Sequence, residues 1–205
     1  MEKYLYIKPL SLPKELCEQI ISEFCSDNLN DMRYIGVMAK GVDTEYKDTT
    51  DLNITHLKMV PFWKNLMVLL NHEIELNIQT YLQQLNISSP HEWKILTIPV
   101  FQLQKYKSNQ GKYHNHQDSI ATKYTQRIIT FLWYLNDVTE GGETTFWNDH
   151  VKIKPVAGNL LLFPAHVSFD HCGKMPISND KYILTGWIYE SINLVPVQTD
   201  LSDTL

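Results

Sequence analysis

Residues 128–135 read Ile-Ile-Thr-Phe-Leu-Trp-Tyr-Leu, a nearly continuous run of apolar side chains. A run of this length is typical of a β-strand that is buried on both faces. Similar strand-like segments lie around it, at residues 95–98, 100–104, 144–147, 151–153, 160–163 and 182–189. Glycine turns at Gly141-Gly142 and Gly158 separate several of them. Short strands at such close spacing predict a β-sandwich or barrel over residues 93–190.

The first 92 residues have a different pattern and are predicted to form a helical support for this β-core. Residues 14–24 place four apolar side chains on one stripe (Leu16, Ile20, Ile21 and Phe24), and Pro13 marks the helix start. A longer helix is expected after Pro61, where apolar residues recur at 3.6-residue spacing as far as Leu85. Residues 26–55 are polar and irregular, and they are predicted to form a loop with one short strand at 33–38.

The length of 205 residues fits a single domain, with 1–92 as support, 93–190 as the β-core and 191–205 as a polar tail. A net charge of −5 disfavours nucleic acid as a partner, because non-specific binding of nucleic acid depends on basic surfaces. We find no secretory signal and no apolar run that approaches the length of a membrane span. Three widely spaced cysteines do not resemble a disulfide framework, so we expect a reducing, cytoplasmic setting. The oligomeric state is left open.

Three residues, distant in sequence, carry the chemistry: the pair His116-x-Asp118, and His171. Residues i and i+2 of a strand point to the same face, so His116 and Asp118 can reach one ion from one strand or strand end. Two imidazoles and one carboxylate leave metal positions open, which suits an Fe(II) that binds a cosubstrate and O₂. Lys181 follows His171 by ten residues, and such a basic group suits a cosubstrate with a distal carboxylate.

The pair H-x-D alone is a weak signal in a chain with eight histidines. His114 adds an alternative, because it shares the face of His116 and Asp118 in a regular strand. Those three residues can be interpreted as a zinc or cupin-like site. His150 and His166 are also available, but we interpret both as turn or packing residues.

The surroundings of these residues form a longer ordered pattern. It begins with a tyrosine, a glycine and a second tyrosine ahead of the pair, in the sequence Tyr106-Lys-Ser-Asn-Gln-Gly111-Lys-Tyr113-His-Asn-His116-Gln-Asp118. It continues through Arg127-Ile-Ile-Thr130-Phe-Leu-Trp-Tyr134, Glu140-Gly141-Gly142-Glu143-Thr144-Thr145-Phe146 and Pro155-Val-Ala-Gly158-Asn-Leu-Leu-Leu-Phe163-Pro164. It closes with His171-Cys-Gly-Lys-Met-Pro176 and Lys181-Tyr-Ile-Leu-Thr185-Gly-Trp187. Over roughly residues 98–190 the chain resembles the prolyl 4-hydroxylase branch of the Fe(II)/2-oxoglutarate-dependent dioxygenases.

The resemblance implies a mainly β fold, a double-stranded β-helix (jelly-roll) barrel flanked by N-terminal helices. It implies His116, Asp118 and His171 as iron ligands, and Lys181 as the partner of the distal carboxylate of 2-oxoglutarate. Further implied site residues bind the cosubstrate or shape its pocket (Tyr106, Tyr134 and Thr185), wall the pocket beside the metal (Trp187) or lie near the substrate entrance (Arg127). One departure is Ser178-Asn179-Asp180 before Lys181, where the family usually has a glycine; Asp180 can compete for the charge of Lys181.

The implied reaction is hydroxylation of an unactivated C–H bond, with peptidyl-proline as the leading substrate. It would use Fe(II), 2-oxoglutarate, O₂ and ascorbate, and it would release succinate and CO₂. Two alternatives stay open on the sequence alone, since a fold does not determine a substrate. One is hydroxylation of a free amino acid or another small metabolite. The other is a non-catalytic, metal-binding jelly-roll module.

Overall fold

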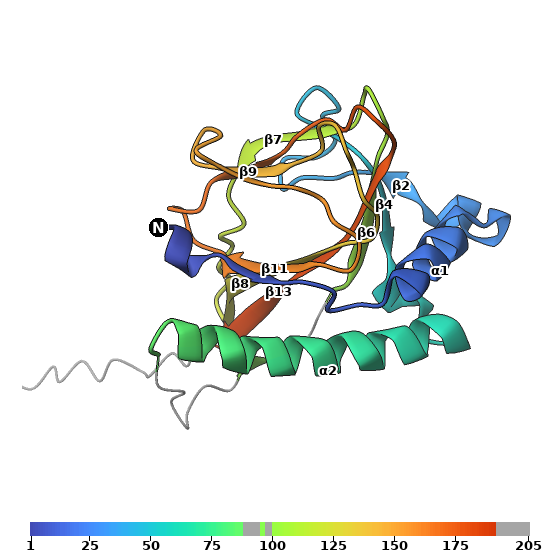
Figure 1. Cartoon of the computed structure of the whole chain (residues 1–205). Coiled ribbons are helices and arrows are strands. Elements are labelled where there is room, and N and C mark those ends of the chain that lie inside the picture. The colour runs from blue at the N-terminus through green and yellow to red at the C-terminus, as the bar shows by residue number, and fades with distance from the viewer. Residues whose placement is uncertain (88–94, 97–99, 192–205) are drawn as a thin grey trace, which may run out of the picture.

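The computed structural model describes residues 1–87, 95–96 and 100–191. The predicted strand positions Thr97 and Ile98 and the predicted polar tail from residue 192 lie outside the described residues. The core consists of two antiparallel β-sheets that face each other, with helices packed outside one of them (Figure 1).

The larger sheet has eight strands and forms the side of the molecule next to the helices (Figure 1). Its order is β1 (Tyr6–Lys8), β11 (Leu160–Pro164), β8 (Thr125–Tyr134), β13 (Lys181–Ser191), β6 (Gln102–Tyr106), β4 (Thr50–Asn53) and β2 (Tyr34–Ile35), and β5 (Ile95–Leu96) pairs with β13. The smaller sheet has five strands in the order β10 (Val151–Ile153), β9 (Thr144–Phe146), β12 (His171–Gly173), β7 (Lys112–His116) and β3 (Lys47–Asp48). The two facing sheets form a jelly roll, which confirms the predicted fold class.

Strand β8 explains why the apolar run at 128–135 determines the fold. Its side chains alternate between the two sides of the larger sheet, as strand geometry requires. Phe131 and Trp133 belong to the core between this sheet and the helices. Leu132 and Tyr134 belong to a second core between the two sheets. Both faces of β8 are therefore buried, and the face that carries Leu132 and Tyr134 lines the interior of the barrel.

Both predicted helices are present: α1 (Lys14–Cys25) and α2 (Pro61–Gln84). Helix α2 runs along the outer face of the larger sheet (Figure 1) and buries a stripe that includes Leu66, Leu70 and Ile74. Short 3₁₀ turns complete the helical part at η1 (Glu2–Tyr4), η2 (Asp27–Met32) and η3 (Ile54–Leu57). Within the part of the chain that the structure describes, no helix has the combination of length and apolar character that crossing a bilayer requires.

Residues 26–55 contain more structure than a loop with one strand at 33–38. Strand β2 falls inside the predicted segment, but η2, β3, β4 and η3 were not expected there. The reason is that these elements are only two to six residues long and bury polar side chains. Lys47 on β3 and Asp51 on β4 are both almost fully buried, so the usual alternation of apolar and polar residues is absent.

Lys47 and Asp51 form a buried ion pair where the chain crosses from the smaller to the larger sheet. Lys47 Nζ lies 2.8 Å from Asp51 Oδ2, and the exposed fractions of the two side chains are 3% and 0%. Gln102 also donates to Asp51 Oδ2, at 2.7 Å. The pair thus connects β3 of one sheet with β4 of the other on the flank of the barrel.

We expect Lys47→Met to lower the free energy of unfolding by about 3–5 kcal/mol, because it leaves a buried carboxylate without its partner. The double variant Lys47→Met/Asp51→Leu should recover most of this loss, since it removes both charges. Urea unfolding of both proteins measures the difference. Lys105→Met is the matched control: it breaks a pair with Asp180 that is about 30% exposed, and it should cost less than about 1 kcal/mol. Equal losses at the two sites would contradict the argument.

Candidate active site

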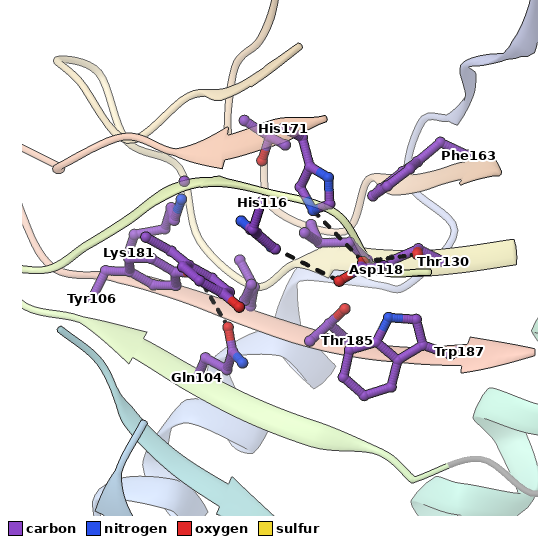
Figure 2. A pocket seen from close by; sticks show the side chains of 15 residues that line it. Gln104, Tyr106, His116, Asp118, Thr130, Phe163, His171, Lys181, Thr185 and Trp187 are labelled. Carbon is purple, nitrogen blue, oxygen red and sulfur yellow. Dashed lines mark hydrogen bonds and ion pairs between the residues drawn. The ribbon is translucent and has the colours of Figure 1, made fainter. Parts of the chain in front are cut away.

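The structure brings His116, Asp118 and His171 together at one end of the barrel interior (Figure 2). His116 is the last residue of β7, Asp118 follows two residues later, and His171 begins β12. Strands β7 and β12 pair so that His171 stands opposite His116, which closes the gap of more than fifty residues between them. One ligand atom from each residue lies within 4.8 Å of the others. Asp118 carboxylate oxygens lie 3.8 Å from His116 Nε2 and 3.6 Å from His171 Nε2.

Hydrogen bonds orient all three side chains. His116 Nδ1 lies 2.8 Å from the His114 carbonyl oxygen, and His171 Nδ1 lies 3.1 Å from the Phe169 carbonyl oxygen. A carbonyl only accepts, so each Nδ1 carries the proton and each Nε2 keeps a lone pair. Thr130 donates to Asp118 Oδ2 at 2.8 Å. Partners of this kind are what hold metal ligands in position.

The charge states of these groups suit a cation. Burial, together with the neighbouring His171, lowers the pKa of His116 to about 3, so its imidazole is neutral at pH 7. Burial opposes the charge on Asp118, but the neighbouring His171 and His116, followed by the Trp187 and Thr130 side chains, hold the pKa of this carboxyl below its ordinary value. Neutral imidazole and ionised carboxylate are the forms that bind metals.

The alternative site with His114 is not supported. The His114 side chain is exposed, and its ring packs against Tyr46 with centroids 5.6 Å apart. Among the described residues, His116, Asp118 and His171 are the one group of at least three histidine, cysteine or carboxylate side chains that gathers closely enough to share an ion.

A small enclosed cavity of about 40 Å³ extends from these three residues into the barrel. Its other lining residues all come from strands of the two sheets: Gln104, Tyr106, Tyr113, Thr130, Leu132, Thr144, Phe163, Gly173, Lys181, Ile183, Thr185 and Trp187. Four of the predicted site residues are among them, namely Tyr106, Lys181, Thr185 and Trp187. Tyr134 is not in the lining, but its hydroxyl group contacts the lining residue Thr144.

Lys181 is the one basic residue among the side chains that line this cavity, and it is only 1% exposed. Its Nζ donates to the Gly142 carbonyl oxygen at 2.9 Å and lies 4.2 Å from the centroid of the Tyr106 ring. Burial lowers the pKa of Lys181 to about 7. Asp180 does not compete for this charge, because it pairs with Lys105 at 2.9 Å and accepts a hydrogen bond from the Ser108 backbone N–H.

The hydroxyl groups of the predicted pocket residues all have partners. Tyr134 donates to Thr144 Oγ1 at 2.7 Å, Thr185 donates to the Phe131 carbonyl oxygen at 2.8 Å, and Tyr106 donates to Gln104 Oε1 at 3.2 Å. Thr130, Thr144 and Gln104 were not predicted as site residues. For Thr130 a signal exists in the sequence, because it shares the inward face of β8 with Leu132 and Tyr134.

The side chains of Trp187 and Arg127 stack against each other beside the metal cluster. Trp187 lines the cavity, and its indole N–H is buried without a hydrogen-bond partner among the described residues. The Arg127 guanidinium stacks 3.5 Å from the centroid of the Trp187 ring, and Arg127 Nε donates to the Tyr189 hydroxyl. Arg127 itself lines a separate surface hollow with Ile120 and His166 rather than the enclosed cavity. Arg127 therefore contacts a residue of the cavity wall, Trp187, without lining the cavity itself.

A wide groove of about 870 Å³ reaches His116 of the metal cluster. Residues 38–44 form one side of it, and Tyr46, Tyr113 and His116 form the other. The Tyr113 ring stacks on the His116 ring with centroids 3.5 Å apart. His116 thus borders both the groove and the enclosed cavity.

The donor set fits the iron and cosubstrate that the sequence suggested. Two imidazole nitrogens and one carboxylate oxygen converge from one side, which is the arrangement of non-haem Fe(II) sites with open positions. The cavity that they line also has a buried lysine in its wall, which suits a ligand with a carboxylate group.

Comparison with known proteins agrees with this geometry. Residues 101–189 match the model of the 2OG-Fe(II) oxygenase superfamily. The chain is 33% identical to a probable prolyl 4-hydroxylase of Arabidopsis thaliana, over 43% of this chain and 40% of the relative. It is 32% identical to a putative prolyl 4-hydroxylase of Acanthamoeba polyphaga mimivirus, over 43% of this chain and 44% of the relative. The matches thus span less than half the length of these relatives.

Solved structures share the fold at low sequence identity. A Trichoplax adhaerens prolyl hydroxylase, solved with a peptide fragment of the hypoxia inducible factor oxygen degradation domain, superposes with a TM-score of 0.68 at 18% identity, over 92% of this chain and 84% of that one. A viral collagen prolyl hydroxylase from Paramecium Bursaria Chlorella virus-1, in its 2OG complex, gives 0.63 at 19% identity, over 92% and 96%. Residues 101–189, which carry the whole metal cluster and cavity, match the 2OG-Fe(II) oxygenase superfamily and are similar to its prolyl 4-hydroxylases.

Proposed function

We propose that this protein is an Fe(II)- and 2-oxoglutarate-dependent dioxygenase that hydroxylates a prolyl residue in a peptide or protein. The observation that carries the proposal is that His116, Asp118 and His171 lie close enough to share an ion and line one cavity together with the buried Lys181. When bound, Fe(II) and 2-oxoglutarate supply the oxidising power for C–H hydroxylation with O₂, with release of succinate and CO₂, and ascorbate serves as a reductant.

The chain's own residues prepare the site for this chemistry. The two histidines present unprotonated Nε2 atoms, and Thr130 holds the Asp118 carboxylate toward them. Lys181 binds the distal carboxylate of the cosubstrate, with the Tyr134 and Thr144 hydroxyls beside it in the deep part of the pocket. A charge-assisted bond of this kind is strong because the site is enclosed. Apolar side chains of Leu132, Phe163 and Ile183 exclude water from it.

The groove beside His116 supports a peptide rather than a single amino acid as the substrate. Its volume of about 870 Å³ is near the upper end of the range for ligand pockets, roughly 300–1,000 Å³. Its lining includes Met38, Val42 and the rings of Tyr46 and Tyr113, together with the charged residues Lys40 and Asp43. Apolar and aromatic walls of this kind suit the compact, apolar ring of proline. The Trichoplax neighbour was solved with a peptide, which is consistent with this substrate class.

Conversion of 2-oxoglutarate to succinate, in the presence of Fe(II), O₂ and ascorbate, tests the dioxygenase activity directly. We expect slow conversion without substrate and faster conversion with a suitable peptide. A library of proline-containing peptides, screened by mass spectrometry for the gain of one oxygen atom, then identifies the substrate. Free proline and other free amino acids are the controls. Metal binding without any succinate formation would favour the non-catalytic module, and oxidation of free amino acids alone would exclude the peptide substrate.

A further inference from the structure

Gln104 has an unusual position for a polar side chain. It lies in the middle of β6, is 5% exposed, and lines the enclosed cavity rather than the protein surface (Figure 2). Most buried polar groups in proteins are fully hydrogen-bonded, so a buried amide inside a ligand cavity requires an explanation.

The hydrogen bonds of Gln104 account for only one end of its side chain. Its Oε1 accepts the hydroxyl proton of Tyr106 at 3.2 Å. A glutamine amide also carries two N–H donors on Nε2, and these have no partner among the described residues. The nitrogen is not sealed off by neighbouring atoms, and the residue faces the cavity. The amide therefore offers donors to whatever fills that space.

The pairing of β6 with β13 places this donor between two groups of the cosubstrate pocket. Tyr106 stands opposite Lys181, Gln104 stands opposite Ile183, and position 102 stands opposite Thr185. Gln104 is thus one step along the barrel from Lys181, in the direction of Thr185. In Figure 2 its amide lies below Tyr106, on the side of the cavity that faces Thr185.

We propose that Gln104 is a further cosubstrate-binding residue, whose side-chain amide donates a hydrogen bond to an oxygen of 2-oxoglutarate. The inference rests on the proposed function, because it assigns a contact within the same pocket. The Tyr106 hydroxyl fixes the orientation of the amide by donating to Oε1, so Nε2 is left for the ligand. An anionic ligand suits this arrangement, because Lys181, the Gln104 amide and the hydroxyl groups of the cavity can all donate hydrogen bonds to it.

A purely structural role for Gln104 makes a different prediction. Asp51 stands opposite Gln104 in the β4–β6 pair, and its Oδ1 is buried without a partner among the described residues. In a structural role, the amide would serve this oxygen rather than a ligand. In that case, loss of the amide lowers the stability of the protein and leaves its affinity for 2-oxoglutarate unchanged.

Calorimetric titration of the Zn(II)-loaded protein with 2-oxoglutarate separates the two roles, because Zn(II) supports no turnover. We expect Gln104→Met, which keeps the length of the side chain, to weaken binding by about 10- to 100-fold, as for one lost hydrogen bond to a charged group. Gln104→Glu should weaken binding at least as much, because the new carboxylate would lie close to a carboxylate of 2-oxoglutarate and repel it. Gln126→Met is the matched control, because the Gln126 amide bonds to Glu190 away from the cavity, and it should bind like the wild type.

A second measurement uses the wild-type protein and so does not depend on the folding of a variant. The side-chain amide resonances of Gln104, in a ¹⁵N spectrum of the Zn(II) form, should shift when 2-oxoglutarate is added. Wild-type affinity in Gln104→Met, or an amide resonance that does not respond, overturns the inference while the proposed function stands. Failure of the wild-type protein to bind 2-oxoglutarate overturns both.

Discussion

Alanine at His116, Asp118 or His171 should abolish the formation of succinate from 2-oxoglutarate and strongly weaken metal binding. Each variant removes one of the three atoms that converge on the open space of the cluster. Substitution of a residue that only supports a metal ligand typically lowers metal affinity or activity by roughly 10- to 100-fold. Loss of a direct ligand should lower both by more than this. Binding of Zn(II), followed by calorimetry, and succinate, measured by mass spectrometry, provide two independent measurements.

His114→Ala is the matched control for this experiment. His114 lies two residues before His116 on the same strand, but it is exposed and packs on Tyr46. We therefore expect His114→Ala to retain metal affinity and turnover. Wild-type activity in His116→Ala, combined with loss of activity in His114→Ala, would show that the wrong histidine has been assigned. Thermal unfolding of all four variants identifies any loss that is caused by misfolding.

The extent to which the sequence predicted the fold depended on the length and pattern of each element. The apolar run of β8 and the long stripe of α2 were recognised because many residues carried one periodic signal. Strands β3 and β4 were missed because they are short and bury Lys47 and Asp51, whose ion pair forms only when two sheets come together. Their strand partners, β7 and β6, are distant in the sequence, and pairing of this kind leaves no local pattern.

The residues of the candidate site were likewise predicted only where a local signal exists in the sequence. Motif spacing identified the residues with chemically distinctive side chains, and the structure brings His116, Asp118, His171 and Lys181 to one cavity. Residues whose roles depend on a partner were not identified. Gly142 seemed to be only part of a turn, yet its carbonyl oxygen accepts from Lys181. Arg127 was expected at the substrate entrance, but its visible contact is with the face of Trp187.

Lys181→Met should raise the concentration of 2-oxoglutarate needed for half-saturation by about 100-fold or more. A buried carboxylate that loses its charged partner typically costs 2–5 kcal/mol of binding energy, of which each 1.4 kcal/mol is about tenfold. The methionine keeps the length of the side chain, so the cavity retains its shape. Titration of the Zn(II) form with 2-oxoglutarate measures the change. An unchanged affinity would show that another residue holds the distal carboxylate.

The same lysine predicts how binding depends on pH. Burial lowers the pKa of Lys181 to about 7 in the ligand-free protein, so its amine loses the proton as the pH rises above that value. A bound carboxylate favours the protonated form and raises this pKa, so binding takes up a proton above pH 7. Affinity for 2-oxoglutarate should therefore be nearly constant from pH 6 to 7 and fall by up to about tenfold per unit above it.

Lys181→Arg provides the control for this pH dependence, because a guanidinium stays charged throughout the range. Its affinity for 2-oxoglutarate, whatever its absolute value, should show no decline between pH 7 and 8.5. Titration in two buffers with different ionisation enthalpies counts the protons taken up by the wild type at pH 8. A decline of equal steepness in both proteins would assign the titration to a group other than Lys181, and the buried amine would then be charged in the free protein as well.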